Sequence, residues 1–165
     1  MTRRLGLLAC DSIWEPLRSR HGDYAEMIAA WLRPAGADFE LVTYAAHAGE
    51  LPARVDACAA WVISGSRAGV YESLPWIPPL MDFVRAAHAA RLPLLGICFG
   101  HQLLAAALGG RTERAPSGWG LGNVSVRLRA GVRPPPRAGL DLYMAHQDQV
   151  VELPPGAVWL AEAPH

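Results

Sequence analysis

The stretch GICFGHQ, residues 96–102, places Cys98 between two glycines, with a histidine three positions later. A nucleophile between small residues, where a strand gives way to a helix, is typical of a nucleophile elbow, in which a tight, strained turn holds the side chain out. The following helix would direct its positive end near the sulfur and favour the reactive thiolate. The G-x-C-x-G spacing alone leaves a second interpretation open, a buried cysteine in an α/β core.

The elements that would position this cysteine follow an alternating pattern. Apolar runs predict strands over 4–10, 39–44, 59–64 and 92–97. Helical spacing and helix-ending residues predict helices over 24–32, 78–90 and 100–108. This order predicts an α/β fold with a doubly wound, mostly parallel sheet and helices on both faces. Further strands are expected over 124–128, over 140–145 and from 158, with an Arg- and Pro-rich turn over 133–137, giving a β-rich C-terminal part.

Composition narrows the function classes. The chain has 165 residues and is 52% hydrophobic, which is enough for one domain with a core. Fifteen basic residues, all of them arginine, balance fifteen acidic ones, so we expect no nucleic-acid or membrane partner. The absence of lysine excludes a Walker A loop and a lysine Schiff base. Three widely spaced cysteines predict no disulfide framework and no zinc site, and we expect no metal and no cofactor.

The apolar run over residues 5–10 is too short for a signal peptide or a membrane span. We therefore expect a cytoplasmic protein. Nothing in the sequence indicates an oligomeric state.

Three segments, in order along the chain, resemble class I glutamine amidotransferases. GICFGHQ is similar to the nucleophile motif of that family, and residues 63–66 followed by VYE (70–72) resemble its oxyanion loop. AHQDQV (145–150) resembles its S-H-x-D-x-V segment, and WGLG (119–122) resembles its middle region. The likeness covers the chain from about residue 60 to its end and is of the GMP-synthetase type of glutaminase domain.

The resemblance implies a glutaminase that acts through a thioester. Cys98 would attack the side-chain amide of glutamine, and the released ammonia would pass to an acceptor in a separate synthetase subunit. The oxyanion hole would be formed by backbone N–H groups of Gly65 or Ser66 and of Phe99. The implied substrate site consists of five residues: Gln102, Ala145, His146, Gln147 and Asp148.

The family's base histidine belongs to an H-P-E segment, and this sequence contains none. We therefore expect residues 1–165 to form a single amidotransferase-like domain that is truncated at its C-terminus and impaired in hydrolysis. His101 is expected to pack under the site, facing away from the sulfur. On an extended backbone His146 and Asp148 would point to the same side, as a base and its orienting acid do, whereas the resemblance gives His146 a substrate-lining role. The remaining histidines are expected in loops, at the surface or at the mobile terminus: His21, His47, His88 and His165.

Three functions remain open at this point. The first is an amidotransferase domain that supplies ammonia. The second is a non-catalytic relative that binds glutamine or a partner protein, which the missing H-P-E favours. The third is another cysteine hydrolase on a similar elbow, such as a γ-glutamyl hydrolase or a peptidase. The retained Cys98 with its glycines favours the first, because a site that had lost its function would not be expected to keep so costly a turn.

Overall fold

The computed structural model describes residues 3–35, 38–129 and 140–163 of the chain. The first half contains β1 (Arg3–Leu8), α1 (Glu15–His21), α2 (Tyr24–Leu32), β2 (Phe39–Tyr44), β3 (Ala60–Ile63) and α3 (Ile77–Ala89). The second half contains β4 (Leu94–Gly96), α4 (Phe99–Ala107), β5 (Arg111–Arg114), β6 (Gly120–Leu128), β7 (Leu140–His146), β8 (Asp148–Glu152) and β9 (Ala161–Glu162). Short 3₁₀ helices lie at Arg33–Ala35, Ala46–Ala48 and Val55–Ala57. The turn expected over 133–137, and His165, lie outside the described residues.

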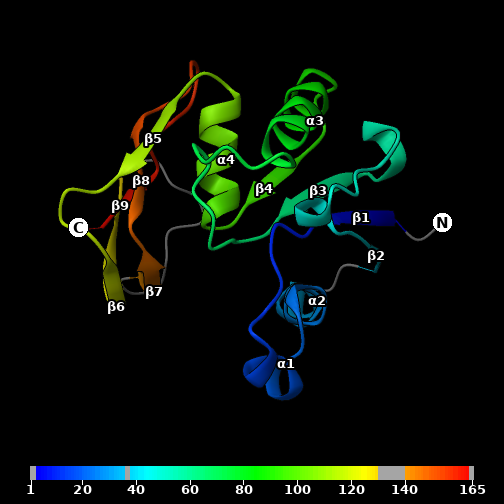
Figure 1. The fold of residues 1–165 in the computed structure, drawn as a ribbon, viewed down its shortest axis with the longest axis horizontal. Coiled ribbons are helices and arrows are strands. Elements are labelled where there is room, and N and C mark those ends of the chain that lie inside the picture. The colour runs from blue at the N-terminus through cyan, green and yellow to red at the C-terminus, as the bar shows by residue number, and fades with distance from the viewer. Residues whose placement is uncertain (1–2, 36–37, 130–139, 164–165) are drawn as a thin grey trace.

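The first four strands form a parallel sheet in the order β2-β1-β3-β4 (Figure 1). Helices α3 and α4 lie on one side of this sheet, and α1 and α2 lie on the other (Figure 1). The α/β fold with a parallel sheet is therefore confirmed. The chain leaves β1 toward β2 on one side and returns to β3 on the other, which creates the kind of crevice at the carboxyl ends of the strands where such sheets bind ligands.

Alternation along the central strands explains the two apolar layers. Leu7 and Val62 pack with Ile28 of α2, whereas Leu8 and Ile63 face the larger cluster under α3 and α4. All five of these side chains are buried. Because successive residues of a strand point to opposite faces, an uninterrupted apolar run is what a strand covered on both faces requires.

Helix α2 begins and ends where the sequence predicts. Asp23 and Glu26 form a reciprocal capping box at its start, which satisfies backbone N–H groups of the first turn. Within this helix only Ile28 is buried, while Met27 and Trp31 remain exposed. The sheet thus covers a narrower stripe of this helix than its apolar residues suggest.

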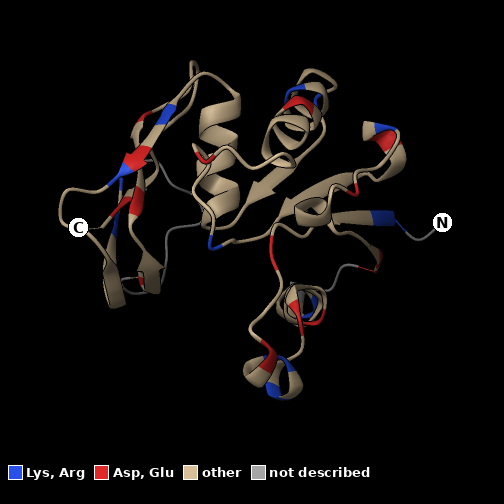
Figure 2. Cartoon of the chain, in the orientation of Figure 1, with Lys and Arg blue, Asp and Glu red and all other residues tan. Residues whose placement is uncertain are grey.

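The β-rich part does not extend the parallel sheet. Strands β5 and β8 pair with each other, and β6 lies between β7 and β9, all antiparallel. Helix α4 packs against β5 and β8, so the β-rich part lies against this helix (Figure 1). Helix α4 contains no charged residue and is uniformly tan in Figure 2, as expected for a helix packed on two sides. Cross-strand ion pairs occur instead in the β-rich part, for example between Arg111 and Glu152.

Sequence patterns did not predict α1, β5 or β8. Helix α1 buries none of its residues, so no apolar stripe marks it. Strand β5 has the sequence RTER, in which three of four side chains are charged. No helix within the described ranges is both long and apolar enough to cross a membrane.

Candidate active site

Cys98 lies in a strained turn between β4 and α4. Its backbone has φ 53° and ψ −109°, a conformation that side-chain-bearing residues rarely adopt. The turn closes through a hydrogen bond from the Gly100 N–H to the Ile97 carbonyl (2.9 Å), and the Gln102 N–H donates to the Cys98 carbonyl (3.1 Å). This is the geometry of a nucleophile elbow, as the G-x-C-x-G pattern predicted.

The two glycines of the elbow allow three elements to meet without side chains between them. A methyl group on Gly96 would lie 2.4 Å from the carbonyl of Gly100. A methyl group on Gly100 would lie 2.4 Å from the carbonyl oxygen of Ile63 at the end of β3. Neither position can accept a Cβ atom unless the backbone moves, so the close contact of β3, β4 and α4 fixes where Cys98 stands.

Cys98 differs in accessibility from the other two thiols. It is exposed, whereas Cys10 and Cys58 are buried. Desolvation by surrounding protein atoms nonetheless raises the pKa of the Cys98 thiol. A hydrogen bond from the Phe99 N–H lowers this pKa in part, and the negative charge of Asp148 raises it further. We expected the helix terminus to favour the thiolate. The N–H of Phe99 acts in that direction, but desolvation outweighs it and the thiol form is favoured.

The segment that follows β3 lies next to the elbow. A methyl group on Gly65 would be 3.7 Å from Cβ of Cys98, so the expected closeness of these two segments is confirmed. Ser64, which is fully buried, accepts a hydrogen bond from the Cys10 N–H (2.9 Å) and donates one to the Gly65 carbonyl (2.9 Å). The start of this loop is therefore tied to the end of β1.

The same loop is also held by an ion pair. The Arg67 guanidinium donates to both carboxylate oxygens of Asp11 (2.9 and 2.7 Å), and the Arg67 N–H donates to one of them (2.9 Å). Burial alone would raise the pKa of Asp11, but hydrogen bonds from Arg67 and from the Ser12 N–H lower it to about 2. Asp11 is thus ionised at neutral pH and anchors the loop to the end of β1.

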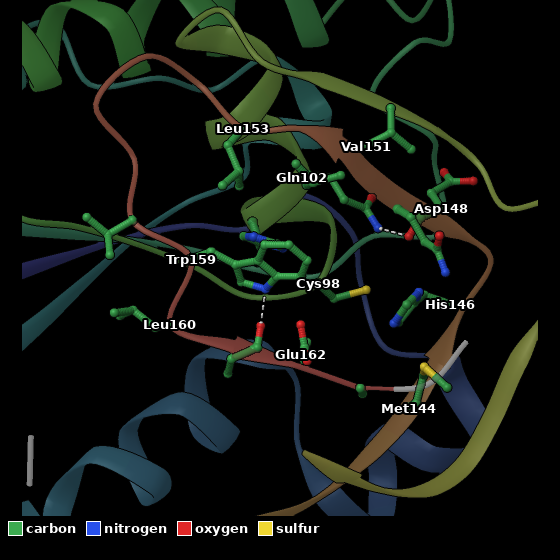
Figure 3. A pocket seen from close by; sticks show the side chains of 16 residues that line it. Cys98, Gln102, Met144, His146, Asp148, Val151, Leu153, Trp159, Leu160 and Glu162 are labelled. Atoms are coloured by element: carbon green, nitrogen blue, oxygen red, sulfur yellow. Dashed lines mark hydrogen bonds between the residues drawn. The ribbon is translucent and has the colours of Figure 1, made fainter. Parts of the chain in front are cut away.

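A cavity of about 850 Å³ opens in front of the cysteine (Figure 3). From α4 and its cap it is lined by Cys98, His101 and Gln102, and from β7 and β8 by Met144, His146, Asp148, Gln149, Val150 and Val151. Its far wall consists of Leu153, Val158, Trp159, Leu160, Ala161, Glu162 and Ala163. The cavity thus joins the elbow to the β-rich part, and both polar and apolar groups face it.

The implied substrate residues are only partly gathered here. Gln102, His146 and Asp148 line the cavity, and the Gln102 amide donates to the Asp148 carbonyl (3.0 Å; Figure 3). Ala145 and Gln147 are not among the described residues that line it. The Gln147 carbonyl accepts a hydrogen bond from the Ala115 N–H (2.7 Å) instead. Between residues 144 and 148 the even-numbered positions face the cavity and the odd-numbered ones do not, as expected where an extended chain alternates its faces.

His101 is a site residue that sequence reasoning placed wrongly. It was expected to pack under the site, facing away from the sulfur, but it is exposed and lines the cavity with Cys98. Surrounding protein atoms lower its pKa, and nearby His146 lowers it further, so the neutral imidazole is favoured. The spacing could have revealed its place, since residues i and i+3 share one face of a helix. Within the described ranges no cluster of side chains could hold a metal ion.

This constellation of an exposed cysteine on an elbow, a glycine loop beside it and a cavity in front is suited to acyl transfer on a carbonyl substrate. Comparison with known proteins agrees. The family model of class I glutamine amidotransferases matches residues 20–165. The chain therefore belongs to the class I glutamine amidotransferase family, whose members include hydrolase-type enzymes.

Individual relatives give the scale of the likeness. The chain is 32% identical to γ-glutamyl peptidase 4 of Arabidopsis thaliana over 154 residues, covering 87% of this chain and 60% of the peptidase. It is 35% identical to the glutamine-hydrolysing GMP synthase of Nitrosococcus oceani over 152 residues, covering 86% of this chain and 28% of the synthase. A glutamine amidotransferase structure from Thermotoga maritima superposes with a TM-score of 0.76 at 22% identity, covering 97% of this chain and 66% of that one. The chain thus spans less than two thirds of the peptidase and less than a third of the synthase.

Proposed function

We propose that Cys98 is the nucleophile of a glutaminase site that releases ammonia from the side-chain amide of glutamine. The observation that carries this proposal is the strained turn at Cys98, which presents an exposed sulfur at a cavity. Strain of this kind persists only where the surrounding structure enforces it, and here two glycines pack against backbone to do so. A buried structural cysteine would require none of these features.

In the proposed reaction the sulfur attacks the amide carbon and the carbon–nitrogen bond breaks. The proton of the thiol leaves with the ammonia, and a γ-glutamyl thioester remains on Cys98. Water then attacks the thioester, which releases glutamate and restores the thiol. The Phe99 N–H, already directed at the sulfur, and a backbone N–H of Gly65 or Ser66 would stabilise the oxyanion, and such a donor is typically worth about 3 kcal/mol of barrier.

Substrate contacts in this proposal come from the facing wall. Gln102, His146 and Asp148 would line the glutamine site, because they surround the cavity in front of Cys98. Ala145 and Gln147 would contribute through backbone groups rather than side chains. His146 keeps two proposed roles, substrate lining or proton transfer, and the substitution His146→Ala separates them.

The size of the cavity favours a second candidate, a γ-glutamyl peptide or conjugate as substrate. About 850 Å³ exceeds what a glutamine side chain needs, and the wall beyond His146 contains Val158, Trp159 and Leu160. An apolar group attached to the γ-nitrogen would contact this wall, whereas the ammonia of glutamine would leave it empty. The similarity to γ-glutamyl peptidase 4 supports this alternative to the same degree as the similarity to GMP synthase supports the first.

The partners and compartment are also proposals. Relatives named GMP synthase carry an additional part to which this chain does not align, so a synthetase domain or subunit is the proposed acceptor of ammonia. Three cysteines without a disulfide suit a reducing compartment, which supports a cytoplasmic location. The proposal treats residues 1–165 as one amidotransferase-like unit, and the relatives extend beyond it.

The experiment that tests the proposal is acylation of the purified chain by a γ-glutamyl thioester, followed by intact mass and peptide mapping. A thioester is suitable because its thiolate leaves without a proton donor. We expect one γ-glutamyl group on Cys98 and none in Cys98→Ala. Cys58→Ala is the matched control, because it removes a buried thiol and should be acylated like the parent.

Two results would overturn parts of this proposal. Acylation of Cys10 or Cys58 in place of Cys98 would remove the assigned nucleophile. A comparison of glutamine with a γ-glutamyl anilide as competitors of acylation distinguishes the substrates. If the anilide competes at least tenfold better, the second candidate replaces the first.

A further inference from the structure

Tyr71 joins the loop beside Cys98 to the strand that faces it. Its hydroxyl donates a hydrogen bond to Oδ1 of Asp148 at 3.0 Å, across 77 positions of sequence. Tyr71 lies in the loop between β3 and α3, and Asp148 is the first residue of β8. The bond therefore connects the loop after β3 to the β-rich part, at a residue whose other atoms line the cavity.

The loop is shaped to hold the Tyr71 ring in this position. A methyl group on Gly69 would lie 2.8 Å from the Tyr71 ring, so the ring occupies space that any other residue at position 69 would fill. The Gly69 N–H donates to the Glu72 carboxylate (2.8 Å), and the Glu72 N–H donates to the Gly69 carbonyl (3.0 Å). These two bonds close a turn around Tyr71 and fix the direction of its side chain.

Asp148 is firmly placed on the other side. It is buried, with 8% of its surface exposed, and its carboxylate is turned away from the Cys98 sulfur in Figure 3. Its backbone carbonyl accepts a hydrogen bond from the Gln102 side-chain amide, and the Gln102 backbone carbonyl accepts one from the Thr112 hydroxyl (3.3 Å). Asp148 thus receives hydrogen bonds from the loop at its carboxylate and from α4 at its backbone.

We propose that Tyr71 is a positioning residue that, by bonding Asp148, holds the loop carrying Gly65 and Ser66 at a fixed distance from the substrate wall. The inference rests on the proposed function, because it assigns Tyr71 to the alignment of the oxyanion donors with Cys98. Tyr71 does not touch the reacting atoms. It acts through the loop, so its loss affects acyl transfer more than the reactivity of the thiol itself.

Two reagents separate alignment from thiol reactivity. Iodoacetamide alkylates Cys98 by displacement at carbon and forms no oxyanion, whereas a γ-glutamyl thioester acylates it through a tetrahedral oxyanion. In Tyr71→Phe, which removes one oxygen atom, we expect the acylation rate to fall roughly tenfold, the usual scale for a hydrogen bond to a charged group. The alkylation rate should stay within about twofold of the parent. Tyr143→Phe, at an exposed tyrosine of β7, is the matched control and should leave both rates unchanged.

A double-mutant cycle tests whether the bond itself carries the effect. Asp148→Ala should lower the ratio of acylation to alkylation, and adding Tyr71→Phe to it should lower the ratio little further.

Limited trypsin digestion supplies a measurement that requires no reaction at Cys98. Cleavage after Arg67, within the same loop, should be several-fold faster in Tyr71→Phe than in Tyr143→Phe.

The outcomes separate the inference from the function on which it rests. If the parent is acylated and Tyr71→Phe keeps the parental ratio, the inference is overturned and the proposed function stands. Additive effects of the two substitutions in the cycle overturn it as well. A parent chain that iodoacetamide alkylates at Cys98 but the thioester does not acylate overturns both.

Discussion

The two walls of the cavity are built in different ways. The wall that carries Cys98 is backed by fully buried side chains such as Phe99 and Leu103, and its glycines meet backbone at 2.4 Å. The opposite wall, over 151–163, consists of short strands and turns whose large apolar residues are about half exposed, for example Leu153, Trp159 and Leu160. The first wall has one possible arrangement, whereas the second is held by few buried contacts.

This difference separates the part of the molecule that fixes the position of Cys98 from the parts that contact the substrate. The position and strained backbone of Cys98 follow from packing within the parallel sheet and α4. We expect proton transfer and substrate fit to depend on groups outside this wall, and this sequence contains no counterpart of the family's H-P-E segment. The cavity also contains two histidines, His101 on α4 beside Cys98 and His146 at the end of β7.

The largest expected effect concerns the H-P-E segment. A polypeptide of these 165 residues should hydrolyse glutamine about a hundred- to ten-thousand-fold more slowly than the same polypeptide continued through an H-P-E segment, because general acid–base help is worth that much. Loss of ammonia needs a proton donor, and breaking the thioester needs a base for water. A glutaminase assay on both polypeptides, with Cys98→Ala as the blank, measures the ratio.

His146→Ala provides the decisive control for this prediction. If the 165-residue polypeptide turns over glutamine rapidly and His146→Ala abolishes turnover with glutamine binding intact, the prediction is wrong. His146 would then be the base. The difference in packing between the two walls would no longer correspond to a difference in function.

The second prediction tests the rigidity of the first wall. Gly100→Ala should destabilise the chain by about 3 kcal/mol or more, since its methyl group would overlap the Ile63 carbonyl and force backbone apart. Gly65→Ala is the matched control: the nearest atoms to its methyl group are the Tyr24 hydroxyl at 3.5 Å and Cβ of Cys98 at 3.7 Å. It should cost less than about 1 kcal/mol. Urea unfolding of the three proteins decides, and equal losses would contradict a uniquely tight elbow.

The same contrast explains what the sequence could reveal of the fold. Helix α2 and strand β2 have the predicted bounds, because capping residues and an apolar run of strand length mark them locally. The other predicted strands of the parallel sheet and helices α3 and α4 differ by one to a few residues at their ends. Strands β5 and β8 were missed, since their pairing partners are far apart in sequence and their side chains are largely polar or charged. Local patterns also indicated β7 and the second half of β6, but they missed the pair of strands that packs against α4.

The features of the candidate site also differ in how well the sequence predicts them. Cys98 and Gly65 could be predicted to meet, because carboxyl ends of parallel strands lie on one edge of a sheet. Helical spacing puts His101 on the same side of α4 as Cys98, but we expected it to face away from the sulfur. The bond between Tyr71 and Asp148 could not be predicted, since it depends on how the β-rich part is oriented against α4. No periodicity within either segment encodes that orientation.

The third prediction concerns the thiol and its dependence on pH. Desolvation by the surrounding protein atoms raises the pKa of Cys98 above its ordinary value of 9.0 although the residue is exposed, so the thiolate is the minor form at neutral pH. Iodoacetamide alkylation of Cys98 should therefore rise about tenfold for each pH unit between 7 and 9, without levelling. Rates followed by peptide mapping test this, and a plateau below pH 8 would show that the helix terminus outweighs desolvation. Cys10, whose pKa is raised to about 12 by burial, should stay unlabelled over this range.

The smallest expected effect compares one substitution at two tryptophans. Trp61, behind the first wall, is 1% exposed, packs edge-on against Phe83 at 4.9 Å between ring centroids and donates to the Val55 carbonyl. Trp159, in the second wall, is 50% exposed, lies under the Arg129 guanidinium at 4.4 Å and donates to the Ala161 carbonyl.

Each indole N–H therefore bonds one backbone carbonyl, and replacement by phenylalanine removes that bond in both. Trp61→Phe also leaves a void in a close-packed core and should cost about 2–3 kcal/mol. At Trp159 water can replace the lost partner and the phenyl ring keeps its contact with Arg129, so Trp159→Phe should cost about 0.5 kcal/mol or less. Urea unfolding of both variants measures the difference. A loss at Trp159 equal to that at Trp61 would mean that the second wall is as tightly built as the first, and the comparison between the walls would fail.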